Sequence, residues 1–354
     1  MGLAVKRLKS GYGHRGSVLV LVLIVVSSMA IVSVGLAYRT RIELKLARTN
    51  AQRVQAYYLA LAGVARSKAL LSKQELSPAT IAGICRFAGT ANEEGLFEQL
   101  GQEGLTDRKF LGYSVRDEQS YLNINNSDPA IWENMGSISS EYRAAIIDWV
   151  DADDDTSPDG AETDFYLRLE PPYVSKNKPC LALRELLFLK EVTFRVYTGE
   201  DLNRNSLLDE NEKDGSLSFP PDNEDNKLDS GLVDIFTVYG DGRANINTTS
   251  KAVLSALPGL DESAADTILA YRAGPDGQPG TDDDAYMASA EDLGKVEGLT
   301  EMQIELLQQY CCFESRHFRI FSYAKVDESC ECCLMATVSC EEGGLRLLCL
   351  ERLL

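Results

Sequence analysis

The chain has 354 residues, of which 54 are acidic and 35 basic, so its formal net charge at pH 7 is -19. An acidic surface repels nucleic-acid phosphates, which argues against a nucleic-acid-binding protein and suits either divalent-cation binding or simple solubility. The charge is unevenly divided, because the first 53 residues carry nine basic and one acidic side chain and the remainder carries -27. A remainder of about 300 residues is long enough for two domains with separate cores.

The segment from Ser17 to Ala37 contains 21 residues without a charged side chain. At about 1.5 Å of helix per residue it spans roughly 31 Å, close to the hydrocarbon thickness of a bilayer. Four basic residues and no acidic ones precede it, and the apolar run is longer than that of a cleaved secretory signal. We therefore predict a single membrane span with a cytoplasmic N-terminus.

Apolar residues recur every three or four positions beyond this segment, in a stripe from Leu44 through Val54 and Tyr58 to Ala65. The stripe predicts one helix over 17–72, with its first half in a membrane and its second half laid against a folded domain. Strand-like runs follow at 110–115, 318–326, 334–340 and 345–350. The predicted fold class is α+β: a long N-terminal transmembrane helix packed on a small antiparallel sheet, with a large, mainly helical inserted domain.

The predicted domains are a basic leader at 1–16, a transmembrane and stalk helix at 17–72, a sheet domain made of 73–120 and 314–354, and an inserted domain at 121–313. Within the insert, 245–310 has the pattern of paired helix-hairpin-helix motifs. Such motifs usually bind the DNA backbone, but Asp261 and Glu301 stand here where phosphates would bind. We expect a protein-packing role and no nucleic-acid partner.

The most specific local pattern of the insert starts at Asp201. Oxygen-bearing side chains occur at positions 1, 3, 5, 9 and 12 of the segment 201–212, which is the spacing of a calcium loop. Ser206 replaces the usual glycine and no clear helices flank the segment, so we expect a calcium loop outside an EF-hand; the alternative is a solvated acidic loop. Residues 222–229 complete this site or form a second one. The candidate ligands are Asp201, Asn203, Asn205, Leu207, Asp209, Glu212, Asp222, Asn226 and Asp229.

Two other acidic clusters are weaker calcium candidates. The first comprises Asp151, Asp153, Asp155, Asp159 and Glu162, and its alternative explanation is a helix cap followed by a loop. The second comprises Asp276, Asp282 and Asp284, which interrupt the helix-hairpin-helix region. In each case the expected role of calcium is structural, because it would neutralise clustered carboxylates and let a polar segment fold.

Seven of the nine cysteines lie between Cys311 and Cys349. In an exported domain the default expectation is disulfides, which would staple the terminal strands, and an odd total leaves at least one thiol unpaired. A zinc site is the alternative, but the spacing at Cys330-Glu331-Cys332-Cys333 and the presence of only two histidines disfavour it. No nucleophile and base arrangement and no phosphate-binding loop stand out, so an enzyme is not expected.

The order of these features resembles the general secretion pathway protein K family, the large minor pseudopilins of type II secretion systems. The resemblance is carried by the leader ending in Gly16, by Arg39 to Ala65, by Ile147-Asp148-Trp149-Val150-Asp151-Ala152-Asp153 with Gly160-Ala161-Glu162, and by Asn245-Ile246-Asn247. It implies that a prepilin peptidase cuts after Gly16 and leaves Ser17, often methylated in this family, as the new N-terminus. Leu21 stands where most pilins carry glutamate, a departure that fits the K subgroup.

The resemblance also implies a place and partners. The chain would be anchored in the inner membrane with its C-terminal domain in the periplasm, at the tip of a pseudopilus built from other minor pseudopilins and the major pseudopilin. There it would prime assembly and help to export folded proteins, and calcium in the family's inserted domain supports the calcium prediction. Two alternatives are a minor pilin of a type IV filament, used for adhesion or DNA uptake, and a membrane-anchored helix-hairpin-helix DNA receptor; the large insertion and Leu21 favour secretion.

Overall fold

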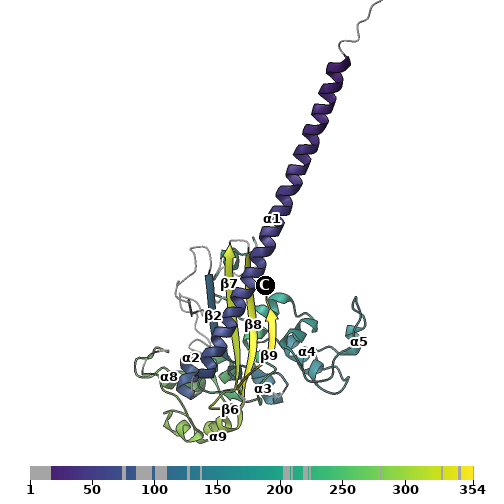
Figure 1. The fold of residues 1–354 in the computed structure, drawn as a ribbon. Helices are drawn as coiled ribbons and strands as arrows, with labels where there is room; N and C mark the ends of the chain where they lie inside the picture. The colour runs from purple at the N-terminus through teal and green to yellow at the C-terminus, as the bar shows by residue number, and fades with distance from the viewer. Residues whose placement is uncertain are drawn as a thin grey trace, which may run out of the picture. The chain divides into compact units, whose positions relative to one another are not determined.

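A computed structural model describes residues 17–73, 77–84, 98–99, 110–125, 128–135, 138–201, 208, 210–217, 222, 225–279, 281, 283–327, 330–341 and 344–353. The chain divides into two compact units, Met1–Val54 and Gln55–Leu354. Helix α1 (Ser17–Lys73) begins in the first unit and ends in the second (Figure 1).

The N-terminal part of α1 confirms the prediction of one long apolar helix. The helix is long and apolar enough to cross a membrane, and none of its most apolar stretch is buried. Ser17 is its first residue, whereas Gly16 and the rest of the basic leader lie outside the described residues. The helix is therefore a candidate membrane anchor.

The second unit contains a five-stranded sheet in the order β1-β2-β7-β8-β9, antiparallel at every pairing. Figure 1 labels its strands β2, β7, β8 and β9. Its strands are β1 (Glu98–Gln99), β2 (Phe110–Asp117), β7 (His317–Asp327), β8 (Cys330–Glu341) and β9 (Gly344–Arg352). The predicted strand runs are confirmed. The pairing of Phe110 with Lys325 and of Asp117 with Phe318 joins strands that are about 200 residues apart in the sequence. The long segment between them is thus an insertion into one sheet.

The end of α1 packs on this sheet, but through a different face from the predicted one. Ala56, Ala60 and Val64 are buried at intervals of four residues, in one cluster with apolar residues of β7 and β8. By contrast, Val54 is 56% exposed and Tyr58 64% exposed. The prediction took the stripe with the larger apolar side chains as the packing face. The structure uses the face with smaller residues, which let the helix backbone come close to the sheet. The larger stripe is left on the outer side of the helix.

The inserted region has mixed helix and strand content in short elements. Its helices are α3 (Pro129–Asn134), α4 (Ser140–Val150), α5 (Thr163–Tyr166), α6 (Phe194–Thr198), α7 (Lys251–Ala256), α8 (Glu262–Arg272) and α9 (Glu301–Tyr310), while α2 (Pro78–Ile84) precedes β2. The 3-10 turns are η1 (Glu118–Ser120), η2 (Leu183–Phe188), η3 (Glu210–Glu212), η4 (Leu232–Asp234) and η5 (Ala290–Lys295). Two short parallel pairs join β3 (Leu122–Asn123) to β4 (Phe236–Thr237) and β5 (Ala244–Asn245) to β6 (Cys311–Cys312). One buried apolar cluster extends from Leu122 to Cys311.

Two helical pairs occupy the predicted helix-hairpin-helix region. Helices α7 and α8 flank a turn at Gly259, and η5 and α9 flank a turn at Gly298; both glycines have positive φ angles, +73° and +102°, that other residues rarely adopt. Asp261 caps α8, because its Oδ1 accepts a hydrogen bond from the backbone N–H of Ala264 at 2.8 Å. The acidic residue after the first turn thus has a structural task. The assignment of these pairs as helix-hairpin-helix motifs, and the predicted domain boundaries, stay predictions.

A buried ion pair joins the insert to the sheet within the second unit. The guanidinium of Arg319 on β7, which is 1% exposed, donates from Nη2 and Nε to the Glu118 carboxylate at 2.6 and 2.7 Å. The same guanidinium donates to the carbonyl of Val233 at 2.8 Å and lies 4.4 Å from the centre of the Tyr121 ring. Each nitrogen of the guanidinium therefore contacts the segment between β2 and β7, which holds the insert against the sheet.

Candidate metal centre in the insert

Three carboxylates of the insert converge at one point. One ligand oxygen each from Asp148, Asp151 and Glu162 lie within 4.8 Å of one another. Asp148 belongs to the last turn of α4, Asp151 is the residue that ends this helix, and Glu162 immediately precedes α5. Asp148 and Glu162 are buried, with 0% and 2% exposure, and Asp151 is partly buried.

These carboxylates receive few hydrogen bonds. Both oxygens of Glu162 and Oδ1 of Asp151 are buried without a hydrogen-bond partner among the described residues. Asp148 accepts from the backbone N–H of Ser157 at 3.2 and 3.3 Å, through both of its oxygens. Since a buried carboxylate is normally hydrogen-bonded or paired, Glu162 and one oxygen of Asp151 lack the partners that their burial requires.

The electrostatic surroundings disfavour ionised carboxylates at this point. Burial, followed by repulsion from Asp153 and Asp148, raises the pKa of Asp151. Burial also raises the pKa of Glu162, with repulsion from Asp148 and Asp151 added and a partial offset from the Ser175 hydroxyl. The C-terminal end of α4 adds the negative end of a helix dipole, which favours a cation over carboxylates. A bound cation would favour the ionised carboxylates and so act against the rise in their pKa values.

Gly160 leaves the space in which Asp148 sits. A Cβ atom added to Gly160 would overlap the carboxylate group of Asp148, Oδ2 most severely. Any larger residue at this position would therefore displace one arm of the cluster. The φ angle of Gly160 lies outside the positive region, so the backbone conformation does not require a glycine. The close approach of the Asp148 carboxylate requires it instead.

A cation at this cluster would connect two helices. Its ligands come from α4 and from the start of α5, so a cation held by all three would tie together the two ends of the loop 152–161. Oxygen-only donor sets of carboxylates are typical of calcium and magnesium. The aromatic contact of Trp149 with Tyr166, with ring centroids 5.3 Å apart, holds the same two helices to each other.

The structure separates the first weak calcium candidate of the sequence into two groups. It brings Asp151 and Glu162 together, whereas Asp153 accepts a hydrogen bond from the backbone N–H of Asp155, and Asp159 accepts one from the hydroxyl of Ser140. Sequence reasoning missed Asp148. The available signal was its spacing of three residues before Asp151, which places both carboxylates on one face at the end of a helix.

The strongest sequence candidate, 201–229, lies largely outside the described residues: Asn203, Asn205, Leu207 and Asp209 are not described. Among the described members, Asp201 and Glu212 are buried and Asp222 Oδ2 accepts from the backbone N–H of Gly215 at 2.8 Å. Their neighbour Glu200 is buried and binds Arg195 at 3.0 Å. The remaining candidates, Asn226 and Asp229, are described as exposed residues.

In the third candidate, Asp282 lies outside the described residues. Backbone N–H groups donate hydrogen bonds to two of the neighbouring acids. Asp276 accepts from the N–H of Gln278 at 2.8 Å, and Asp283 accepts from the N–H of Asp276 at 3.1 Å. Asp284 accepts from the hydroxyl of Tyr286 at 3.3 Å. These contacts are those of a hydrogen-bonded turn.

The eight described cysteines form no disulfide with one another, so the expected disulfide staple is wrong for this part of the chain. Strand geometry gives the reason, since consecutive residues of β8 point to opposite faces and place Cys332 and Cys333 in different apolar clusters. Burial raises the pKa of Cys180 and of Cys312 to about 12, so these thiols stay protonated and behave as apolar side chains.

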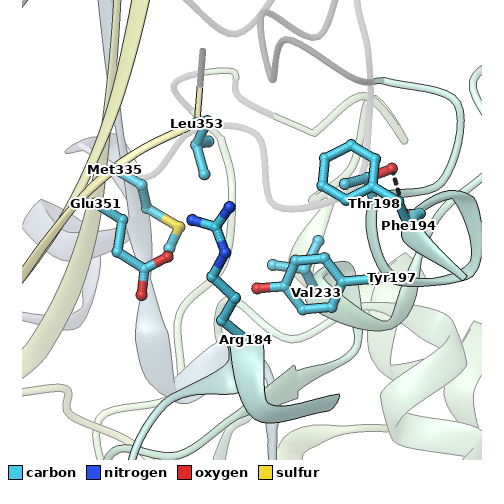
Figure 2. Close-up of a pocket in the computed structure, with 8 residues that line it drawn as sticks. All are labelled: Arg184, Phe194, Tyr197, Thr198, Val233, Met335, Glu351 and Leu353. Atoms are coloured by element: carbon cyan, nitrogen blue, oxygen red, sulfur yellow. Dashed lines mark hydrogen bonds between the residues drawn. The ribbon is translucent and has the colours of Figure 1, made fainter. Parts of the chain in front are cut away.

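A small pocket lies between the insert and the C-terminal strands of the second unit (Figure 2). Figure 2 shows the Arg184 side chain reaching up between Tyr197 on one side and Met335 with Glu351 on the other, with Leu353 above it. The lining is mostly apolar side chains packed across the junction. The pocket is therefore part of the packing between insert and sheet and presents no cluster of chemically reactive groups.

Comparisons with known proteins agree with this architecture. A family model described as "Type II secretion system (T2SS), protein K" matches residues 133–199, which include the three clustered carboxylates. Type II secretion system protein K of Klebsiella pneumoniae is 24% identical over 210 residues, which are 52% of this chain and 60% of that protein. The protein of the same description from Aeromonas hydrophila is 25% identical over 208 residues, which are 51% of this chain and 60% of that protein. The matches thus span 60% of the length of each relative.

A solved structure supports the fold. It is described as the crystal structure of the GspK-GspI-GspJ complex from the type 2 secretion system of enterotoxigenic Escherichia coli. One of its chains superposes on this chain with a TM-score of 0.50 at 13% sequence identity, covering 86% of this chain and 99% of that chain. At this identity the match establishes similarity of fold.

Proposed function

We propose that this chain is a member of the type II secretion system protein K family and acts as a minor pseudopilin at the tip of the secretion pseudopilus. The observation that carries the proposal is the joint presence of a long apolar N-terminal helix, an antiparallel sheet on its end, and an insert between β2 and β7. A bulky insert is tolerated at the end of a filament, whereas a repeating position in the shaft would bring it against its neighbours.

The outer face of α1 supports helix-to-helix assembly. Val54 and Tyr58 remain exposed although they are apolar, and so does Leu44 earlier in the helix. Apolar side chains on a helix that already packs through another face need a second partner in order to leave water. Helices of other minor pseudopilins and of the major pseudopilin are the proposed partners, and nucleic acid is not among them.

The proposal includes processing and orientation. A prepilin peptidase would cut between Gly16 and Ser17, after which Ser17 would be methylated. The helix would anchor the chain once in the inner membrane, with a cytoplasmic N-terminus and the second unit in the periplasm. In this role the chain acts by assembly rather than by catalysis, and priming of the pseudopilus helps folded proteins to cross the outer membrane.

Calcium binding at 201–229 belongs to the same proposal, with the paired helices of 245–310 serving as helix-hairpin-helix packing modules. The described residues fit a cation in chemical type, because Asp201 and Glu212 are buried acids of this segment. Bound calcium would supply positive charge to these acids and let the segment fold.

Co-purification tests the proposed assembly. The full chain is expressed with the two smaller minor pseudopilins of the same secretion system and isolated in detergent. A Tyr58→Arg variant is expected to lose at least one partner, because it places a charge on the outer apolar stripe. Arg53→Ala is the matched control, since Arg53 is exposed and lies five residues earlier, on another side of the helix. Failure of the unaltered chain to retain either partner, together with failure to restore secretion to a strain lacking its protein K, contradicts the proposal.

A further inference from the structure

We propose that the segment 165–195 of the insert forms a docking surface for an acidic, apolar segment of a partner protein. The apolar part of this surface consists of Leu169, Tyr173 and Phe188, which we name the aromatic patch. Its positive charges come from arginines and lysines of the same segment. The proposal goes beyond the pseudopilin role, because the surface does not use α1 and follows from the local structure of the insert.

Exposed apolar side chains concentrate in this segment. Among the described residues outside α1, ten large apolar side chains are exposed, and six of them belong to the segment. These six are Leu167, Leu169, Val174, Leu181, Phe188 and Phe194, while the other four lie at positions 217, 302, 347 and 350. Single exposed apolar residues are ordinary on a protein surface, whereas a concentration of them marks an interaction surface.

The aromatic patch is held in place by the buried Tyr166. The ring of Tyr173 stacks on the Tyr166 ring, with centroids 5.1 Å apart, and meets the Phe188 ring edge-on at 6.0 Å. The Tyr173 hydroxyl also donates to the carbonyl of Phe188 at 2.6 Å. The backbone N–H groups of Leu169 and Tyr173 both donate to the carbonyl of Tyr166, at 3.2 and 3.4 Å. A surface that is ordered in advance loses less conformational entropy when a partner binds.

The segment is basic within an acidic chain. Residues 165–195 contain six basic and three acidic side chains, so their net charge is +3, whereas residues 54–354 as a whole carry -27. An acidic partner is repelled by most of this unit and attracted by this one segment. Charge complementarity therefore sets the sign of the partner's charge.

Three cations of the segment are available to such a partner. Arg168, Lys178 and Arg184 are exposed, and no ion pair within the described part of the chain involves them. Exposed lysines elsewhere in the second unit are paired, because Lys251 contacts one acid at 2.8 Å and Lys295 contacts another at 2.5 Å. The contrast indicates that the positive charges of the segment have their counterpart outside the chain.

A protein segment fits these features better than a membrane does. An anionic membrane is an extended plane, which would bring negative charge within the Debye length of about 8–10 Å of neighbouring acidic loops. One such loop borders the segment, because Nδ2 of Asn177 donates to Asp154 Oδ1 at 3.0 Å. A peptide can contact the aromatic patch alone and avoid this repulsion. Tyrosine, phenylalanine and arginine are also enriched at protein interfaces.

Peptide binding to the full chain tests the proposal. The chain is held in phosphatidylcholine nanodiscs, and the probes are short fluorescent peptides that contain leucine, phenylalanine and glutamate in varied order. Fluorescence anisotropy is expected to show saturable binding of at least one glutamate peptide, weakened by added salt. Reference peptides carry lysine in place of every glutamate. Because the acidic remainder of the chain attracts them, their binding is expected to be insensitive to changes in the aromatic patch.

Two variants and their matched controls locate the binding. Phe188→Ala is expected to weaken binding of the glutamate peptide by about tenfold, as truncation of an aromatic anchor does. Met302→Ala is its control, because Met302 is 70% exposed but lies on α9, outside the segment. Arg168→Glu is expected to weaken the same binding and to reduce its salt dependence. Arg316→Glu, at an exposed arginine outside the segment, is expected to change neither.

Three results overturn the proposal. The first is that the unaltered chain binds none of the glutamate peptides saturably. The second is that Phe188→Ala and Arg168→Glu, both folded by circular dichroism, bind the peptide as tightly as the unaltered chain. The third is Phe188-dependent binding to phosphatidylglycerol vesicles, or Phe188-dependent self-association, without peptide binding, which assigns the surface to a membrane or to a second copy. If Phe188→Ala does not fold, Leu169→Ser at the exposed edge of the aromatic patch gives the same comparison.

Discussion

The second unit of the chain contains two groups of buried acids that are treated in opposite ways. At the junction of sheet and insert, Glu118 is paired with Arg319, and Asp117 accepts hydrogen bonds from Ser315, Thr248 and Asn245 at 2.5 to 2.8 Å. In the insert, Glu162 is equally buried and has no hydrogen-bond partner among the described residues. Both groups are thus far from water, but one is neutralised by the chain itself.

This difference separates a structural network from a candidate ligand site. A buried charge costs several kcal/mol unless it is compensated, so the carboxylate oxygens of Glu162 and Oδ1 of Asp151, which have no hydrogen-bond partner among the described residues, need an external cation or bound protons. The junction network, in contrast, needs nothing from solution. Calcium should therefore alter the stability of the insert and leave the junction unaffected.

The largest effect is expected from breaking the junction. Arg319→Met leaves Glu118 as an unpaired buried charge, and removal of one partner of such a pair costs about 3–5 kcal/mol. Urea unfolding of the detergent-solubilised chain should show this loss with calcium or with EDTA alike. The double variant that adds Glu118→Leu should recover much of it, and a loss that varies with calcium would contradict the separation of the two groups.

Gly160→Ala tests the cation cluster by shape. The added methyl group would overlap the Asp148 carboxylate, and overpacking of this kind costs about 1–3 kcal/mol. Calcium should stabilise this variant less than it stabilises the unaltered chain. Gly294→Ala is the control, since a Cβ atom there meets nothing within 4 Å. Equal calcium stabilisation in Gly160→Ala would show that the Asp148 arm is not a ligand.

A smaller loss is expected at Asp117. Ser315→Ala removes one of several hydrogen-bond donors to this carboxylate. A hydrogen bond to a charged group contributes about 1.5–3 kcal/mol to stability. We expect a loss at the lower end of this range, because the other donors to Asp117 remain. Urea unfolding measures it, and the loss should be independent of calcium. A loss above that of Arg319→Met would reverse the order proposed for the junction.

The smallest effect concerns pH. Burial raises the pKa of Asp117, although its hydrogen bonds from Ser315 and Thr248 lower it in part. The folded state therefore binds this proton more tightly than the unfolded state, whose pKa is about 3.9. Its contribution to stability is complete below that pKa and decreases as the pH rises through the folded pKa. Urea midpoints measured upward from about pH 4 should contain this decrease, and Asp117→Asn should lack it; an identical profile in both proteins would contradict the assignment.

Local patterns predicted the elements of the fold but not their contacts. The strand runs were readable because β-branched and aromatic residues lie between turn residues, and the apolar helix because no charge interrupts it. The packing face of α1 was misjudged, since Val54 and Tyr58 look more apolar than the alanines that contact the sheet. Packing depends on shape as well as on apolarity.

The same limit applies to the sites. Asp151 and Glu162 were both recognisable as calcium candidates, but their convergence with Asp148 depends on the path of the chain between α4 and α5. The pairing of Glu118 with Arg319 joins residues 201 positions apart, and no local pattern signals it. Tertiary structure decides which acids are paired and which have no partner among the described residues.

The mass of the processed N-terminus tests most directly whether this chain is a pseudopilin. The full chain is expressed with a prepilin peptidase, and the membrane form is measured by intact-mass spectrometry. A chain that begins at Ser17, with or without one methyl group, is the predicted result. A chain that keeps residues 1–16 under conditions in which the major pseudopilin is cut would contradict the claim.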